Sequence, residues 1–300
     1  MNIALKIDVH TYRGTREGVP VLVDLLKQVG AGASFVFTVG PDSGGRRLRH
    51  ALRARIGGKR VPALLAQFGW RNLISGVLVP APDIGESCAE EMRAVKEAGF
   101  EIGVSSFEEA AWLALPANAT EATTRWHMEQ AMKRYREVFG TLPHMFAATG
   151  WRMNRHAFRL TQKLGFDYCA DTLGTQPYVP IYQAEVVVCP QIPTTLPTLD
   201  RLLDEGRSPE TSIDRILDMS AHALPSGHVY TAHAELEGGK FVQQFERLLQ
   251  TWKGRGVNLL SLADYFDALP NKDLPRHEIA HANVLGMDHE VTVQGKEFLL

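Results

Sequence analysis

Asp8 and His10 stand at the end of the first apolar run of the chain, at a spacing that could do chemistry. Side chains two residues apart on a strand point to the same face, so these two would lie side by side. An aspartate beside a histidine can supply a base and a metal ligand, and a charged strand end in water is the alternative. Far along the chain, His233 closes the run 229–233, with Glu235 behind it. A histidine at this strand end, across a barrel from Asp8, is suited to act as an acid catalyst.

Two further groups of residues are suited to anions and sugars. Arg13 and Arg16 flank Thr15 directly after the first run, where a helix is expected to begin, which makes a cradle for a phosphate. Solvated surface arginines are the alternative. Trp151 and Arg152 join a predicted strand to a predicted helix, where an indole can stack on a sugar and a guanidinium can bind an anion.

The elements that must position these residues alternate between short β-like runs and longer helical runs. In the first run Ile3, Leu5 and Ile7 alternate with small or polar residues, which predicts a strand. Further strands are expected at 33–40, 101–106, 144–150, 167–171, 185–193, 228–235 and 257–266. Helices are expected at 17–29, 87–99, 120–139, 154–164, 211–223 and 239–253.

Repeated strand–helix–strand units predict a parallel sheet or barrel of seven or eight strands, because each parallel connection needs a crossover. In such folds the chemistry sits at the C-terminal ends of the strands. We therefore expect one mouth of a barrel to be lined by Asp8, His10, Arg152, Asp171 and His233.

Two segments break this alternation. Residues 41–86 are too long for an ordinary connection and carry a basic cluster followed by an apolar, aromatic stretch. That order is typical of an element at a membrane surface, and an insertion packed on the barrel is the alternative. The C-terminal tail, 271–300, contains His277, His281 and His289, which are too scattered for a clear metal signature.

Composition excludes several classes of protein. The net charge of −2 lacks the basic excess of a nucleic-acid-binding protein. Cys88, Cys169 and Cys189 lie far apart with no CxxC, which suits a reducing compartment. The first residues do not resemble a secretory signal, and no apolar run is long enough to span a membrane. We expect a cytoplasmic protein that can contact the inner face of the membrane without crossing it.

Several motifs spread over residues 3–270 resemble one family, namely DVHTYRGTREGVP, FTVGPD, FEIGV, ATGWRMN, QIPTTLPT and VYTAHAELEG. The chain is similar to the polysaccharide deacetylase superfamily, and within it to the deformylases of undecaprenyl-phosphate-linked formamido-arabinose in lipid A modification. The resemblance implies a distorted (β/α)7 barrel in one domain, 1–270. It also implies a metal-dependent amide hydrolase at the membrane face, with a lipid-linked sugar phosphate as substrate and no nucleic-acid partner.

The resemblance also implies roles for particular residues. The general base falls on Asp8 and the general acid on His233, with Asp171 and Arg152 in supporting positions. The family mechanism uses a divalent metal, zinc or similar, that polarises the amide carbonyl and activates water. For substrate binding we expect Arg13, Arg16, Trp151 and Glu235.

The three metal-ligand positions of the family differ in this chain. Where the family has the second acid of Asp-x-Asp, this chain has His10, and where it has His-x-x-x-His, this chain has Ser105 and Glu109. Serine is a poor zinc ligand, whereas His10 and Glu109 are capable ones. Either Asp8, His10 and Glu109 form a rearranged site, or no metal binds. We expect little or no bound zinc, and no deformylase turnover at the rate expected of the family.

Two hypotheses about function follow. The first is a deformylase-like amide hydrolase with a rearranged metal site. The second is an inactive member that binds a glycosyl-phosphate lipid or a protein partner without hydrolysing it. Metal-free hydrolysis by Asp8 and His233 is a third possibility, which lacks a visible oxyanion hole.

Overall fold

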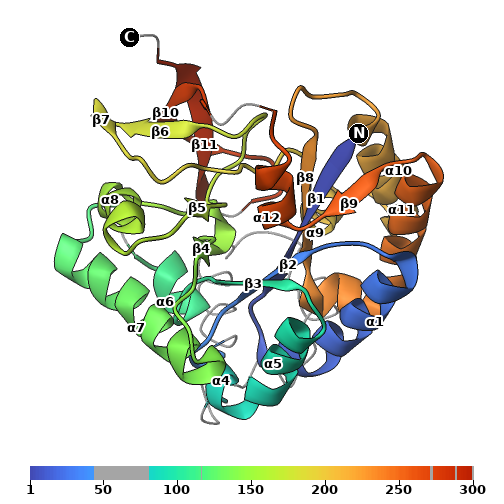
Figure 1. The fold of residues 1–300 in the computed structure, drawn as a ribbon, viewed down its shortest axis with the longest axis horizontal. Coiled ribbons are helices and arrows are strands. Elements are labelled where there is room, and N and C mark those ends of the chain that lie inside the picture. The colour runs from blue at the N-terminus through green and yellow to red at the C-terminus, as the bar shows by residue number, and fades with distance from the viewer. Residues whose placement is uncertain (44–80, 116, 271–272, 288, 299–300) are drawn as a thin grey trace.

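A parallel sheet of seven strands forms the centre of the molecule (Figure 1). The computed structural model describes residues 1–43, 81–115, 117–270, 273–287 and 289–298. The strand order is β5-β4-β3-β2-β1-β8, and β9 pairs with β1. The strands are β1 (Asn2–Val9), β2 (Ser34–Phe37), β3 (Glu101–Val104), β4 (Met145–Phe146), β5 (Tyr168–Cys169), β8 (His228–His233) and β9 (Asn258–Leu260). With its surrounding helices, this sheet confirms the predicted distorted (β/α)7 architecture.

Helices follow the strands and cover the outside of the sheet (Figure 1). The longer ones are α1 (Val19–Val29), α5 (Ala89–Glu97), α7 (Glu121–Phe139), α8 (Arg155–Lys163), α10 (Pro209–Ser220) and α11 (Val242–Gly254). Shorter turns of helix are η1 (Gly14–Gly18), α4 (Ile84–Ser87), α6 (Glu109–Leu113), η2 (Thr149–Trp151), α9 (Leu199–Asp204), η3 (Leu236–Lys240) and α12 (Leu262–Asp267). The run 257–266 therefore divides into a strand and a helix, because the Ser261 side chain accepts from the Asp264 amide and caps α12.

The alternation along β1 separates two layers of core. Ile3, Leu5 and Ile7 are fully or almost fully buried in the cluster under the outer helices. Ala4 belongs to a second apolar cluster inside the barrel. Since side chains alternate on a strand, residues 6 and 8 also face inward, above this inner cluster.

Between β5 and β8 the barrel is closed by irregular chain. We expected a strand at 185–193, but only β7 (Glu185–Val186) is one, and it lies in a separate sheet. Pro190 and Pro193 have no amide hydrogen, which prevents a continuous ladder there. Gln191 still bridges to Cys169, and the amide of Leu196 donates to the Val229 carbonyl, so this stretch spans from β5 to β8.

The C-terminal tail folds back onto the barrel. Its strands β10 (Arg276–Asn283) and β11 (Glu290–Glu297) form a hairpin in the second sheet, which has the order β11-β10-β6-β7 and includes β6 (Val179–Tyr182). The amide of Met153 donates to Thr292, which ties β11 to the segment after η2. The division into a 1–270 domain and a tail stays a prediction.

Most of the predicted insertion, 41–86, lies outside the described residues, including its basic cluster and apolar stretch. Its two ends are described and lie side by side, because Pro41 and Asp83 form an antiparallel bridge. The predicted membrane contact therefore stays a prediction.

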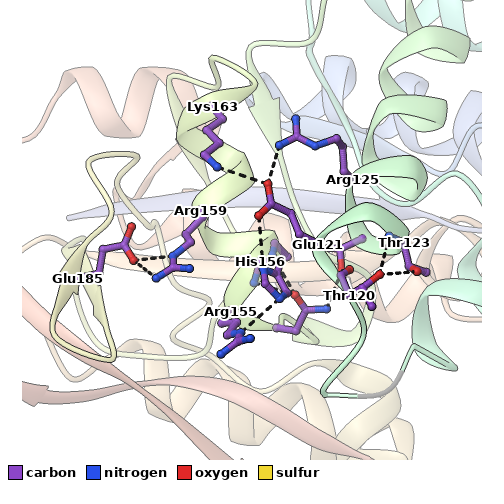
Figure 2. Close-up of polar contacts among 12 residues, drawn as sticks. Thr120, Glu121, Thr123, Arg125, Arg155, His156, Arg159, Lys163 and Glu185 are labelled. Carbon is purple, nitrogen blue, oxygen red and sulfur yellow. Dashed lines mark hydrogen bonds and ion pairs between the residues drawn. The ribbon is translucent and has the colours of Figure 1, made fainter.

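Ion pairs join α7 to α8 and α8 to β7 (Figure 2). Glu121 accepts from Arg125 at 2.7 Å and from Lys163 at 3.4 Å, and Arg159 pairs with Glu185. Each of these three basic side chains has an acidic partner, so this face needs no anionic ligand.

Candidate functional site

Asp8 and His233 are neighbours at the C-terminal ends of two adjacent strands. β1 and β8 run parallel, and their register places Asp8 opposite His233. We expected the two to face each other across the barrel; the pairing places them side by side instead. The nearest donor atoms of Asp8, His10 and His233 lie within 4.8 Å of one another. His10 Nδ1 is 3.0 Å from the Thr38 hydroxyl, which directs its Nε2 to 3.7 Å from Asp8 Oδ2.

Lys6 is part of this site and was missed by the sequence analysis. Its side chain is fully buried, with Nζ 3.2 Å from Asp8 Oδ2 and 5.1 Å from the centre of the Trp151 ring. The signal was present, because Lys6 and Asp8 occupy the same face of a strand whose other face is apolar.

Opposite charges are stabilised on Asp8 and His233. Burial alone would raise the pKa of Asp8, but the Lys6 ammonium, the hydrogen-bonding His10 imidazole and the nearby His233 hold it well below its usual range. Burial alone would lower the pKa of His233, but the carboxylates of Asp200 and Asp8 outweigh it and raise the value to about 9. At neutral pH the site therefore pairs a carboxylate with an imidazolium.

Asp200 was also missed by the sequence analysis. It lies in the first turn of α9, and its Oδ1 is 3.6 Å from His233 Nε2. No strand ends at this residue, so no strand-end rule could find it. Only the folded chain brings α9 to the end of β8.

Several buried polar atoms at this mouth form no hydrogen bond within the described residues. They are Lys6 Nζ, Asp8 Oδ1, Asp200 Oδ1, His233 Nε2 and Glu235 Oε2. Buried polar atoms are normally satisfied, so a cluster of five marks a place where water or a ligand belongs.

Hydroxyl groups fill the position after β3. Ser105 is fully buried, and its hydroxyl lies 2.9 Å from that of Thr149, which is also 2.8 Å from that of Ser106. Glu109 begins α6 and is buried, but it is not one of the described donors that gather around Asp8 and His10. The described donors that gather around Asp8 and His10 include His233, whereas Glu109 belonged to the rearranged site considered as one alternative.

The predicted supporting residues, Arg152 and Asp171, bind mostly backbone atoms. Arg152 donates to the carbonyls of Leu113 at 2.6 Å and Leu115 at 2.9 Å, which fixes the end of α6. Asp171 accepts from the Ala148 amide at 2.6 Å and from Gln191 Nε2 at 3.0 Å. Burial raises the pKa of Asp171 to about 6.

Of the predicted substrate-binding residues, Arg13 and Arg16 are exposed at the surface, whereas Trp151 is buried. Arg13 pairs with Glu17 at 2.6 Å and Arg16 pairs with Glu91 at 3.0 Å, and both arginine side chains are more than half exposed. Trp151 is 4% exposed, and its indole donates to the Thr194 hydroxyl at 3.3 Å. It packs over Lys6 and offers little open surface for stacking.

The charges around Asp8 do not suit a dication. One carboxylate and two imidazoles have the right chemistry for zinc. However, the Lys6 ammonium already lies 3.2 Å from the carboxylate. A metal-binding imidazole must be neutral, and the raised pKa of His233 means that a metal ion would have to displace a proton to bind it at neutral pH. The metal implied by the resemblance is therefore not accommodated by these side chains as they stand.

Two relatives in sequence are similar to almost the whole chain. A protein of Shewanella sediminis named a 4-deoxy-4-formamido-L-arabinose-phosphoundecaprenol deformylase is 31% identical over 301 residues, covering 98% of this chain and 96% of the relative. A protein of the same name from Wigglesworthia glossinidia brevipalpis is 27% identical and covers 94% of this chain and 99% of the relative. No family model matches the chain.

A solved structure supports the fold independently. The crystal structure of a protein from Mycobacterium smegmatis, described as a polysaccharide deacetylase, superposes with a TM-score of 0.63. It covers 94% of this chain and 95% of that one at 14% identity.

In the part of the chain that the structure describes, no helix combines the length and apolar character needed to cross a membrane.

Proposed function

The chain belongs to the family of the 4-deoxy-4-formamido-L-arabinose-phosphoundecaprenol deformylases, and from this premise we propose that it hydrolyses an amide of a lipid-phosphate-linked amino sugar. The observation that carries the proposal is the pair Asp8 and His233, which lie side by side with opposite charges. Amide hydrolysis needs a base for water and an acid for the leaving amine.

The two residues divide the proton transfers. The Asp8 carboxylate takes a proton from a water molecule whose oxygen attacks the formyl carbon. The carbon–nitrogen bond then breaks, and His233 gives its proton to the departing amine. The products are formate and a free amino sugar. Asp200 lies 3.6 Å from His233 and keeps this acid protonated before the step.

Side chains farther out would bind the rest of the substrate. Glu235 Oε2 is one of the buried atoms that form no hydrogen bond within the described part of the chain, and a Cβ built on Gly14 would lie 2.9 Å from it. It therefore lies against the turn that carries Arg13 and Arg16, whose exposed guanidinium groups suit the phosphate of a lipid-linked sugar. The predicted contact of 41–86 with the membrane would present such a substrate.

A second candidate function is binding of the same ligand class without hydrolysis. It is favoured by the hydroxyl cluster of Ser105, Ser106 and Thr149, whose members bind one another where the family resemblance expects a ligand histidine. Such a site retains the charged mouth and the exposed Arg13 and Arg16, but its hydroxyl groups polarise the amide carbonyl of the ligand only weakly.

Formate release from an undecaprenyl-phosphate-linked formamido sugar separates the two functions. We expect release by the wild type and a loss of about 100-fold or more in Asp8→Asn and in His233→Gln. His281→Ala, at an exposed position on β10, is the matched control and should keep the wild-type rate. Binding of the lipid without formate release would reject hydrolysis and establish the second function.

A further inference from the structure

Lys6 occupies an unusual place for a lysine. Its side chain is fully buried on the inner face of β1, and its ammonium forms no hydrogen bond within the described residues. A buried ammonium is costly unless an opposite charge compensates it. The nearest such charge is Asp8 Oδ2 at 3.2 Å.

The neighbours of Lys6 hold it at this carboxylate. The Trp151 ring lies 5.1 Å from Nζ, a distance at which an aromatic face attracts a cation. The Trp151 indole is fixed in turn by its hydrogen bond to the Thr194 hydroxyl. The ammonium also acts on Asp171, the next carboxylate inside the barrel. Lys6 therefore lies among two carboxylates and one aromatic ring, in the interior just below the mouth.

A divalent ion bound to Asp8 would lie within a few ångströms of this ammonium. Two charges on the ion and one on Lys6 would repel strongly in a site with little water. The polar surroundings of Asp8 thus already contain the positive charge that a metal would bring.

We propose that Lys6 compensates the charge of Asp8 as a resident internal cation, and that it thereby excludes a divalent metal from this site. The proposal deepens the proposed function and rests on it for the role of Asp8 as a base. Lys6 is thus a positioning residue, because it acts through Asp8.

Metal binding tests the proposal without reference to turnover. Cobalt(II) and zinc are titrated into the wild type, Lys6→Met, the double variant Lys6→Met/Asp8→Asn, and Lys133→Met as a control. Lys133 is a matched control because its side chain is 70% exposed on α7, so the same charge is removed far from the site. We expect Lys6→Met to bind cobalt on the order of 100-fold more tightly than the wild type, with a new visible absorption band. Lys133→Met should behave as the wild type, and the double variant should lose the gain.

Other results would overturn the proposal. Stoichiometric zinc in the wild type purified without chelator would do so, and so would equal metal affinity in the wild type and a folded Lys6→Met. If Lys6→Met does not fold, the wild-type zinc content decides alone, and Lys6→Arg should remain as metal-free as the wild type. Absence of formate release in every variant would reject the proposed function, whereas the metal affinities would still decide the role of Lys6.

Discussion

The acid at this site depends on a residue outside the strands. Asp200 is the carboxylate that most raises the pKa of His233 against the effect of burial. Replacing Asp200 by Asn removes the charge and keeps the shape, so the pKa of His233 should fall from about 9 toward its ordinary 6.5. The histidine nitrogen shifts in NMR spectra report this value. Asp214→Asn, on the exposed face of α10, should leave the pKa of His233 unchanged. If Asp200→Asn had the same His233 pKa as the wild type, carboxylates other than Asp200 would be the ones that keep the imidazole protonated.

Glu237 should make the stability of the protein depend on pH. It is fully buried, accepts from Tyr230 and from the His233 amide, and has a pKa raised by burial from 4.5 to about 7. Between these values the unfolded chain releases the proton first, so this residue lowers the unfolding free energy as pH rises from 4.5 to 7. The loss is on the order of 3 kcal/mol.

Urea unfolding at several pH values measures this effect. A glutamine can keep both contacts, since its oxygen accepts from the His233 amide and its nitrogen donates to Tyr230. Below pH 4.5, Glu237→Gln should therefore be as stable as the wild type or slightly less stable. From pH 4.5 to 7, its unfolding free energy should rise relative to that of the wild type. A constant difference across this range would contradict the raised pKa.

At the scale of single residues, the sequence predicts those that end strands. Asp8, His10 and His233 were found because strand ends in a parallel barrel share one mouth, and the structure brings them within 4.8 Å. Lys6 lies two residues before Asp8 on the same face of β1, deeper in the barrel. In the sequence it was taken only as one polar position of the alternating strand pattern. Asp200 could not be found, because its contact with His233 depends on how the irregular chain after β5 crosses the barrel.

Among the elements, two turns that follow β1 and β8 touch through glycines. A Cβ on Gly18 would lie 2.1 Å from the Ala234 carbonyl oxygen, and a Cβ on Gly238 would lie 2.5 Å from the Gly18 carbonyl oxygen. This close backbone contact holds η1 against η3 and so fixes the loops behind Asp8 and His233. Gly18→Ala should cost about 2 kcal/mol of unfolding free energy, measured by urea denaturation. Gly254→Ala, where a Cβ meets nothing within 4 Å, should change it little; similar effects of both would reject the contact.

The C-terminal hairpin should stabilise a strained turn at the mouth. Gly150 and Trp151 have φ values of 63° and 51°, in the left-handed region that a tryptophan rarely adopts. His289 Nε2 donates to the Gly150 carbonyl at 2.8 Å. His289→Ala should speed amide hydrogen exchange over 149–154 several-fold and cost about 1 kcal/mol.

The same hairpin supplies the control for this prediction. His281 is exposed on β10, and its ring lies near Tyr182, away from the turn. His281→Ala should leave exchange over 149–154 at the wild-type rate. Unchanged exchange in His289→Ala would mean that the turn is held by other contacts.

At the scale of elements, periodicity predicted the long helices and the main strands, but not the irregular ones. The run 185–193 is apolar and β-branched, yet its prolines interrupt a ladder. The tail has no apolar period that would indicate a hairpin, because β10 and β11 lie at the surface and are only partly buried. Their pairing depends on β6, far away in the sequence.

For the whole molecule, the parallel order of the sheet gathers the site. It places the ends of β1 and β8 side by side, and the crossing chain at 190–196 adds α9 and Asp200 beside them. The inner apolar cluster lies below, so the charges of Lys6, Asp8 and His233 are confined to one end of the barrel. The architecture thus builds a charged mouth over an apolar interior, in which opposite charges compensate one another.

The central claim is that Asp8 and His233 hydrolyse the amide with charge compensation from the protein itself. Formate release from the lipid-linked formamido sugar, measured against pH with chelator-treated protein, tests it most directly. The account predicts a rate that resists chelator and falls as pH rises past about 9, because His233 then loses the proton that the leaving amine needs. A rate that disappears with chelator and returns with added zinc would contradict it.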